Sequence, residues 1–157
     1  MLITNHVLAG AALGLLVDHP GTALAVGLAS HFALDAVPHF GVPREHLMRV
    51  AVPDGLVGLA TIAVIARHTP AHRRLPVLAG ILGSCLPDLD KPGRQFFDRS
   101  PFPDWFDRFH GGIQHESARR LPLEVGAGLA LGVLLRRSLQ RADGPLPRVF
   151  TWPTGSS

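Results

Sequence analysis

Two imidazoles and a carboxylate lie four residues apart in an otherwise apolar stretch, at His31, Asp35 and His39. Positions i and i+4 of a helix share a face, so we expect His31 beside Asp35, with Pro38 turning the chain so that His39 joins them. Imidazole nitrogen and carboxylate oxygen suit zinc, manganese or iron, and burying three such groups is costly unless a cation lies between them. The spacing therefore predicts a metal site. The alternative is a polar trio at a helix end that binds no metal.

Further histidines and aspartates lie at the ends of other apolar segments. The complete set of predicted metal ligands is His6, His31, Asp35, His39, Asp54, Asp88, Asp90, His110 and His115. If the apolar segments cross a membrane in alternating directions, the whole set falls on one side. Ionisable groups within or at the edge of a membrane are rare and usually functional. We expect His31, Asp35, His39, Asp88 and Asp90 to lie nearest the metal, with the others around them.

The size of this set bears on the chemistry. Its nine members, five His and four Asp, exceed the three or four protein ligands of one zinc ion, so one ion or more is expected and two or more could be accommodated. Paired metal ions can activate water and clamp the oxygens of a phosphoester, and a carboxylate can bridge the ions or act as a general base. The predicted catalytic residues are therefore Asp35, Asp88 and Asp90. Hydrolysis is the expected reaction. The sequence has no nucleophile elbow, P-loop or dinucleotide-binding glycine motif, so covalent catalysis is disfavoured.

Five apolar segments must position these residues: 2–17, 21–37, 50–66, 75–86 and 121–135. Most are at or just below the lower end of the roughly 17–25 residues that span a bilayer. We predict an all-α fold, a multi-span helical membrane bundle of about five helices, in a single domain of residues 1–140. Residues 141–157 are predicted to form a disordered tail.

The long connection at 87–120 contains aromatic residues between Phe96 and Phe109, interspersed with Asp and Arg. Such an alternation is expected of a segment at the boundary between water and lipid. A small satellite core folded over the bundle is the alternative.

Composition favours an integral membrane protein that has membrane lipid as a partner. Of 157 residues, 46% are hydrophobic and only 17% charged, against about 25% charged in a typical soluble domain. Mean hydropathy is +0.24. The net charge is +3, but its arginines are spread over the connections without a basic stripe among aromatics, which excludes a nucleic-acid partner. Cys85, the single cysteine, is expected to be a buried apolar residue.

Several of these motifs together resemble a known family. They are His6 before an Ala/Gly run, the Leu86-Pro87-Asp88-Leu89-Asp90 run, His31 with Asp35, and His110 with His115 before an apolar helix. Over roughly residues 1–135 the chain is similar to the bacterial inner-membrane metal-dependent hydrolases typified by YdjM. The spacing of His31, Asp35 and His39 also resembles, more distantly, that of zinc-dependent phospholipase C and the S1/P1 nucleases. The resemblance implies a metal site in a protein of the bacterial cytoplasmic membrane.

The chain departs from that family's pattern at three places. Lys91 stands after Asp90 where the family has histidine, and residues 110–117 read His-Gly-Gly-Ile-Gln-His-Glu-Ser instead of His-Arg-Gly-x-Thr-His-Ser. The stretch with His31 and Asp35 also precedes the Pro-Asp-x-Asp run, whereas in the family it is expected to follow that run. These departures bear on the number of metal ions and on catalysis.

The predicted function is a membrane-embedded metal-dependent hydrolase that acts on a phosphoester or related bond of a lipid or amphiphilic substrate. Zinc is the expected metal, with manganese or iron as alternatives. The other hypotheses are a membrane protein that handles metal ions or protons without hydrolysis, and a structural membrane protein. A transporter should carry polar groups near the middle of several helices. Segments 2–17, 50–66 and 121–135 are apolar through their centres, which favours a site at the surface of the membrane.

Overall fold

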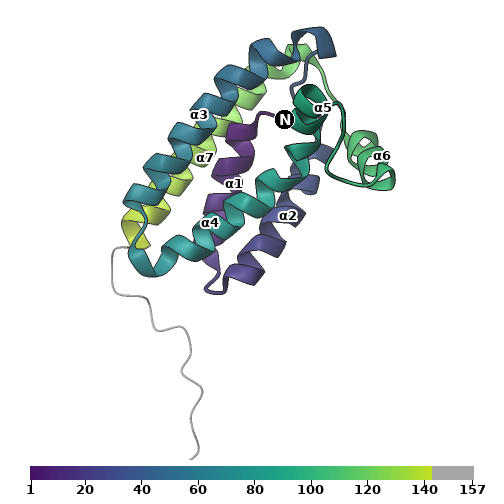
Figure 1. The fold of residues 1–157 in the computed structure, drawn as a ribbon. Coiled ribbons are helices and arrows are strands. Elements are labelled where there is room, and N and C mark those ends of the chain that lie inside the picture. The colour runs from purple at the N-terminus through teal and green to yellow at the C-terminus, as the bar shows by residue number, and fades with distance from the viewer. Residues whose placement is uncertain (143–157) are drawn as a thin grey trace, which may run out of the picture.

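The computed structural model describes residues 1–142, and this part of the chain is all-α (Figure 1). Its long helices are α1 (Ile3–Leu16), α2 (Pro20–Ala36), α3 (Leu47–His68), α4 (Ala71–Cys85) and α7 (Leu121–Ala142). Each contains or nearly coincides with one of the five apolar segments expected from the sequence. Of the predicted tail, residues 141 and 142 end α7, and residues 143–157 lie outside the described part of the chain.

Helix α1 lies at the centre of the bundle and packs against α2, α3, α4 and α7. Its residues 5–11 are all buried, because the helix is apolar or small on nearly every side and has neighbours all round. The hydrophobic core includes Val7 and Ala11 of α1, Val77 and Ile81 of α4, and Leu135 of α7. The predicted apolar segment 2–17 therefore forms the central helix, against which the other long helices pack.

Glycines allow the central helices to approach closely. A Cβ atom placed on Gly10 of α1 would lie 2.7 Å from the Cβ of Ser84, and one placed on Gly80 of α4 would overlap the carbonyl oxygen of Gly10. Only a hydrogen atom fits at these two positions. The ends of α1, α2 and α4 are therefore close enough for their polar residues to meet.

Prolines end two of the helices near the polar residues. Helix α2 ends at Ala36, because Val37 precedes Pro38 and takes an extended conformation. Helix α4 continues at Leu86 into the short 3-10 segment η2 (Leu86–Leu89), which contains Pro87 and leads directly into α5 (Asp90–Phe97). The N-terminus of α1 and the C-terminal ends of α2 and α4 consequently lie at one end of the bundle, beside α5 (Figure 1).

The long connection at 87–120 is helical over much of its length. It contains η2, α5, α6 (Asp104–Ile113) and the 3-10 turn η3 (Ala118–Arg120). Phe106 and Phe109 of α6 pack on Phe32 of α2, with ring centroids 6.0 and 5.3 Å apart. These contacts match the alternative expectation, a small satellite core folded over the bundle. Other aromatic side chains of the connection, including Phe97 at 73%, remain exposed.

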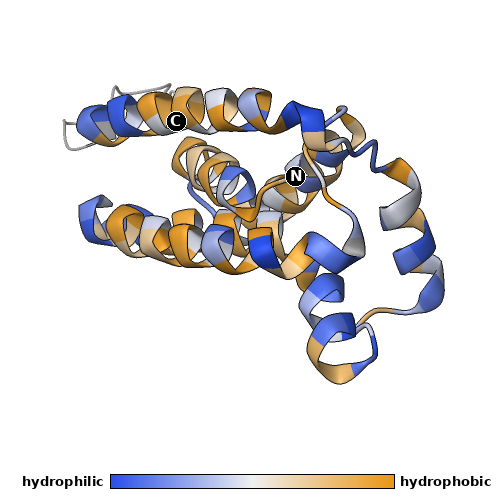
Figure 2. Cartoon of the chain, turned by 90° about the horizontal axis from the view of Figure 1, so that it is seen from above, coloured by the Kyte–Doolittle hydropathy of each residue, from blue (hydrophilic) through white to orange (hydrophobic). Residues whose placement is uncertain are grey.

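Apolar residues cover the long helices, and hydrophilic residues concentrate at helix ends and on α5 and α6 (Figure 2). Among the described residues only α3, with 22 residues, is long and apolar enough to cross a membrane by the criteria of length and composition, which alone is weak evidence. Helices α1 and α4 have 14 and 15 residues, so they rise about 21 and 22 Å, against about 30 Å of bilayer hydrocarbon. The structure therefore confirms the all-α class and leaves the multi-span prediction as a proposal.

Candidate metal centre

Four predicted ligands converge where η2 and α6 meet the end of α2. His31, Asp35, Asp88 and His110 are buried, and each offers one ligand atom within 4.8 Å of the other three. Two donors on one ion, each about 2.0–2.2 Å from it, are at most about 4.4 Å apart, so binding requires the group to close by a few tenths of an ångström. The four residues form a group that can hold a metal ion.

Hydrogen bonds fix which ring nitrogen of each histidine points into this group. His31 Nδ1 lies 2.8 Å from the carbonyl oxygen of Ser84, which can only accept, so Nδ1 carries the proton. His110 Nδ1 likewise donates to Asp90 Oδ2 at 3.2 Å. In the neutral rings, both Nε2 atoms are therefore unprotonated, as a metal ligand must be.

These two Nε2 atoms face each other at only 3.0 Å. Asp35 Oδ2 lies 3.3 Å from His31 Nε2 and 3.1 Å from His110 Nε2. Three acceptor atoms so close repel one another unless a donor or a cation lies among them. The protein supplies one donor, Gln114 Nε2, which lies 2.8 Å from Asp35 Oδ2 and 3.1 Å from His110 Nε2. Ligands of one tetrahedral zinc ion are about 3.4 Å apart, and those of an octahedral ion about 3.0 Å, so the spacing matches shared coordination.

The charge around His110 favours a cation. Burial lowers the pKa of His110, but its hydrogen bonds to Asp35 and Asp90 outweigh burial and raise the pKa to about 9. Without a metal, the imidazole would therefore hold a proton at neutral pH. Metal ions compete with protons for the same nitrogen, so carboxylates that attract a proton here also attract a metal ion.

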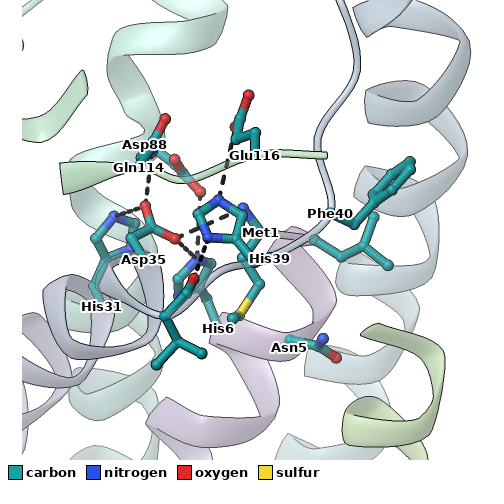
Figure 3. Close-up of polar contacts among 12 residues, drawn as sticks. Met1, Asn5, His6, His31, Asp35, His39, Phe40, Asp88, Gln114 and Glu116 are labelled. Carbon is teal, nitrogen blue, oxygen red and sulfur yellow. Dashed lines mark hydrogen bonds and ion pairs between the residues drawn. The ribbon is translucent and has the colours of Figure 1, made fainter. Parts of the chain in front are cut away.

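His6 extends the group on the other side of Asp35. Its ring stacks on that of His31 with centroids 4.2 Å apart, and its Nε2 lies 3.3 Å from Asp35 Oδ1 and 3.9 Å from Asp88 Oδ2. Both ring nitrogens of His6 are buried without a hydrogen-bond partner, as is Asp35 Oδ1. Asp35 thus faces His31 and His110 with Oδ2 and His6 with Oδ1. Figure 3 shows its carboxylate beside the rings of His31 and His6. A carboxylate in this position can bridge two ions.

Two further predicted ligands lie beside the group. Asp90 reaches it through His110, whose ring it orients by a hydrogen bond. His39 donates from Nδ1 to the carbonyl oxygen of Val37, and its buried Nε2 lies 3.7 Å from Glu116 Oε1 (Figure 3). A short parallel bridge between the backbones of His39 and Glu116 holds this pair.

The structure places two predicted ligands elsewhere, which corrects the sequence interpretation. Asp54 caps the start of α1, where its carboxylate accepts from the backbone N–H of Ile3 at 2.6 Å and from Thr4 Oγ1 at 2.6 Å. His115 is exposed, and its Nδ1 donates to the carbonyl oxygen of Ile113. Both lie at the expected end of the bundle. Hydrogen bonding of Asp54 and the outward position of His115 keep them out of the group.

Sequence reasoning missed residues that support the centre. Gln114 Nε2 donates to Asp35 Oδ2 at 2.8 Å. Glu124 is only 4% exposed and accepts from Asn5 Nδ2, Leu2 N and Phe40 N at 2.8, 3.2 and 3.3 Å. It ties the start of α1 and the segment after α2 to α7. A lone carboxylate in the apolar sequence of α7 was the available signal.

Lys91 directly follows Asp90, and its ammonium group reaches the centre. Its Nζ is 2.8 Å from Asp88 Oδ1. Burial raises the pKa of Asp88, but the charges of Lys91, His6 and His31, together with the hydrogen bond from Lys91, hold that pKa below its usual value. The same oxygen, Oδ1, lies 3.9 Å from His110 Nε2, whereas Oδ2 of Asp88 lies 3.9 Å from His6 Nε2. Lys91 therefore balances the charge of a carboxylate that lies between the two histidines.

Comparisons with models of known families, with curated proteins and with solved structures found no match to this chain.

Proposed function

We propose that the protein is a membrane-embedded metal-dependent hydrolase that acts on a phosphoester or related bond of an amphiphilic substrate, as its resemblance to the YdjM-like family implies. The observation that carries the proposal is the contact between the Nε2 atoms of His31 and His110. Each ring uses its Nδ1 as a donor, and the two Nε2 atoms lie 3.0 Å apart beside Asp35. A shared cation accounts for this arrangement of buried acceptors.

Zinc is the proposed metal, because two imidazoles and two carboxylates make a four-ligand set of the kind that zinc accepts. Manganese and iron are the alternatives. The proposed ligands are His31, His110, Asp35 and Asp88, and His6 with the second oxygen of Asp35 would hold any second ion. Asp90 serves as the outer partner that keeps His110 in the ligand tautomer.

A divalent cation in such a centre supplies Lewis acidity toward a phosphoester and the attacking water. The residues of the chain must hold and orient those groups. Of the predicted catalytic residues Asp35, Asp88 and Asp90, only Asp88 lines the large groove beside the centre. Asp88 is therefore the carboxylate that we propose contacts the substrate or its water. Asp35 is fully buried among three imidazoles, the Gln114 amide and the amino group of Met1, so we assign it the role of a ligand.

Exposed apolar side chains support a membrane location. Large hydrophobic residues on three helices are more than half exposed, among them Leu56 and Leu59 of α3, Leu75 of α4, and Leu129 and Leu134 of α7. Apolar surface on this scale marks contact with lipid or with another protein. We propose that the long helices cross the bilayer, with local thinning around the short helices α1 and α4.

The position of the centre argues against a metal or proton path across the membrane. Beyond His6, α1 is lined by the buried apolar residues Val7 and Ala11, which pack on Val77 and Ile81 of α4. Intramembrane proton and ion paths require polar groups along the way. Within the described residues, the core between these helices is apolar, so a site that acts at one face fits better.

The test is the metal content of the full chain purified in detergent, measured by mass spectrometry. We expect at least one transition-metal ion per chain, its loss in His31→Ala and in His110→Ala, and metal-dependent cleavage of bis(p-nitrophenyl) phosphate. His115→Ala is the matched control, because His115 is exposed and lies in the same connection as His110. This variant should retain the metal. Protein free of transition metal, or equal metal in the His31→Ala and His115→Ala variants, would contradict the proposal.

A further inference from the structure

A large apolar groove begins at the metal centre. Its volume is about 860 Å³, and it lies between the start of α1, the length of α3 and the segment from η2 into α5. Its walls include Leu47, Val52, Leu56 and Leu59 of α3. The volume falls within the roughly 300–1,000 Å³ of typical ligand sites.

The groove exists because α3 packs on α1 through a restricted region. Gly58 of α3 is buried there, and a Cβ atom on it would make ordinary contacts with Ile3 and Thr4. One turn earlier the space is open: Gly55 lines the groove, and a Cβ atom on it would meet nothing within 4 Å. The wall of the groove at Gly55 therefore has room for a ligand.

One end of the groove is polar and touches the centre. Asp88, Lys91, Gln114 and Glu116 line it there. Asp88 belongs to the four-residue group, and Gln114 donates to Asp35, so a ligand at this end would adjoin the metal ligands. Apolar walls that lead to polar groups at one end match a molecule with an apolar chain and a polar head.

Lys91 supplies a positive side chain for that head, beside the amino group of Met1, which also lines the groove and lies 3.7 Å from Asp35 Oδ1. It is the only lysine of the chain, and no arginine is among the described residues that line the groove. Its side chain is 30% exposed, and its Nζ contacts Asp88 at 2.8 Å. Two further carboxylates line the groove, and both have partners: Asp54 is hydrogen-bonded to the start of α1, and Glu116 Oε1 lies 3.7 Å from His39 Nε2. The ammonium group of Lys91 can therefore meet an anion beside the centre.

We propose that this groove holds an acyl chain of an anionic amphiphile, with its phosphate group at Lys91 next to Asp88. The inference names the substrate class of the centre and so rests on the function proposed above. It predicts two separable requirements: space beside Gly55 for the chain, and a positive charge at position 91 for the phosphate.

The test uses the full chain in lipid nanodiscs and two photoreactive probes with the same alkyl chain, hexadecyl phosphate and hexadecanol. Gly55→Phe should reduce labelling of groove peptides by both probes at least fivefold. Gly126→Phe in α7 is the matched control, because a Cβ atom there also meets nothing within 4 Å and the residue does not line the groove. Both probes should label the Gly126→Phe variant as strongly as the wild type. Lys91→Gln should reduce labelling by the phosphate probe alone, and Lys91→Arg should restore it.

Metal content, measured on the same samples, separates the two proposals. If Gly55→Phe and Gly126→Phe are labelled equally while metal remains bound, the groove inference is overturned and the metal centre stands. Equal labelling of the Lys91→Gln variant and the wild type by the phosphate probe would overturn the assignment of an anionic head. Absence of metal from the wild type overturns the proposed function, whatever the labelling shows.

Discussion

Asp90 Oδ2 accepts a hydrogen bond from Nδ1 of His110 at 3.2 Å, and this bond turns Nε2 of the same ring toward His31 and Asp35. Metal-binding histidines commonly hold their second nitrogen in this way, and the outer carboxylate raises the basicity of the ligand. The sequence interpretation placed Asp90 among the ligands. Its contact with His110 makes it a positioning residue.

The Asp90→Asn variant should bind metal about 10- to 100-fold more weakly, because an amide oxygen is a poorer partner for the imidazole N–H. Competition with a fluorescent chelator measures this affinity in the purified chain. Asp104→Asn, at the exposed start of α6, is the control and should leave the affinity unchanged. Equal affinities in both variants would count against a positioning role for Asp90.

Removal of the metal should destabilise the folded chain. At a free metal concentration 100 times the Kd, binding stabilises the native state by about 2.7 kcal/mol. For a chain of this length that corresponds to a shift in Tm of about 5–10 °C. Thermal unfolding with and without EDTA measures the shift, and His31→Ala should make Tm insensitive to EDTA. A wild-type chain that melts at the same temperature in both conditions would exclude a stabilising metal.

Gly80→Ala should loosen the contact between α1 and α4, because the added methyl group would overlap the carbonyl oxygen of Gly10. Forcing backbones apart in a packed core costs about 1–3 kcal/mol. The displacement also separates His6 of α1 from Asp88, which follows α4 and lies 3.9 Å from His6, so binding of any second ion at His6 should weaken with stability. Gly132→Ala in α7 is the control, because its new methyl group meets nothing within 4 Å. Unfolding of the two variants at the same denaturant concentration would contradict a packing role for Gly80.

Glu124→Gln should lower the free energy of unfolding by about 1–3 kcal/mol, because an NH₂ group would replace one acceptor oxygen and leave a buried donor unpaired. The affected donors are Asn5 Nδ2, Leu2 N and Phe40 N. Denaturant unfolding measures the effect. Glu45→Gln, at an exposed position, should unfold like the wild type. If both variants are equally stable, Glu124 does not hold the N-terminal end of α1.

Much of the fold could be read from the sequence, because apolar runs of 12–17 residues bounded by Pro, Gly and Arg fix where helices begin and end. The spacing of His31 and Asp35 also placed their side chains on one face of α2. The helical parts of residues 87–120 were harder to predict, since short polar helices have little apolar periodicity. Their order depends on tertiary contacts such as those of Phe106 and Phe109 with Phe32.

The sequence by itself determined the helical class and the end of the bundle at which the His and Asp residues gather, because helix direction follows from the order of the apolar segments. Tertiary structure decided which of them share a centre. Asp54 turned to the free N–H groups of α1, and His115 turned outward, while His31 and His110, distant in sequence, came within 3.0 Å. The direction of a side chain at a helix end depends on which partner the neighbouring element offers. Residue type and spacing along the sequence do not show which element will be the neighbour.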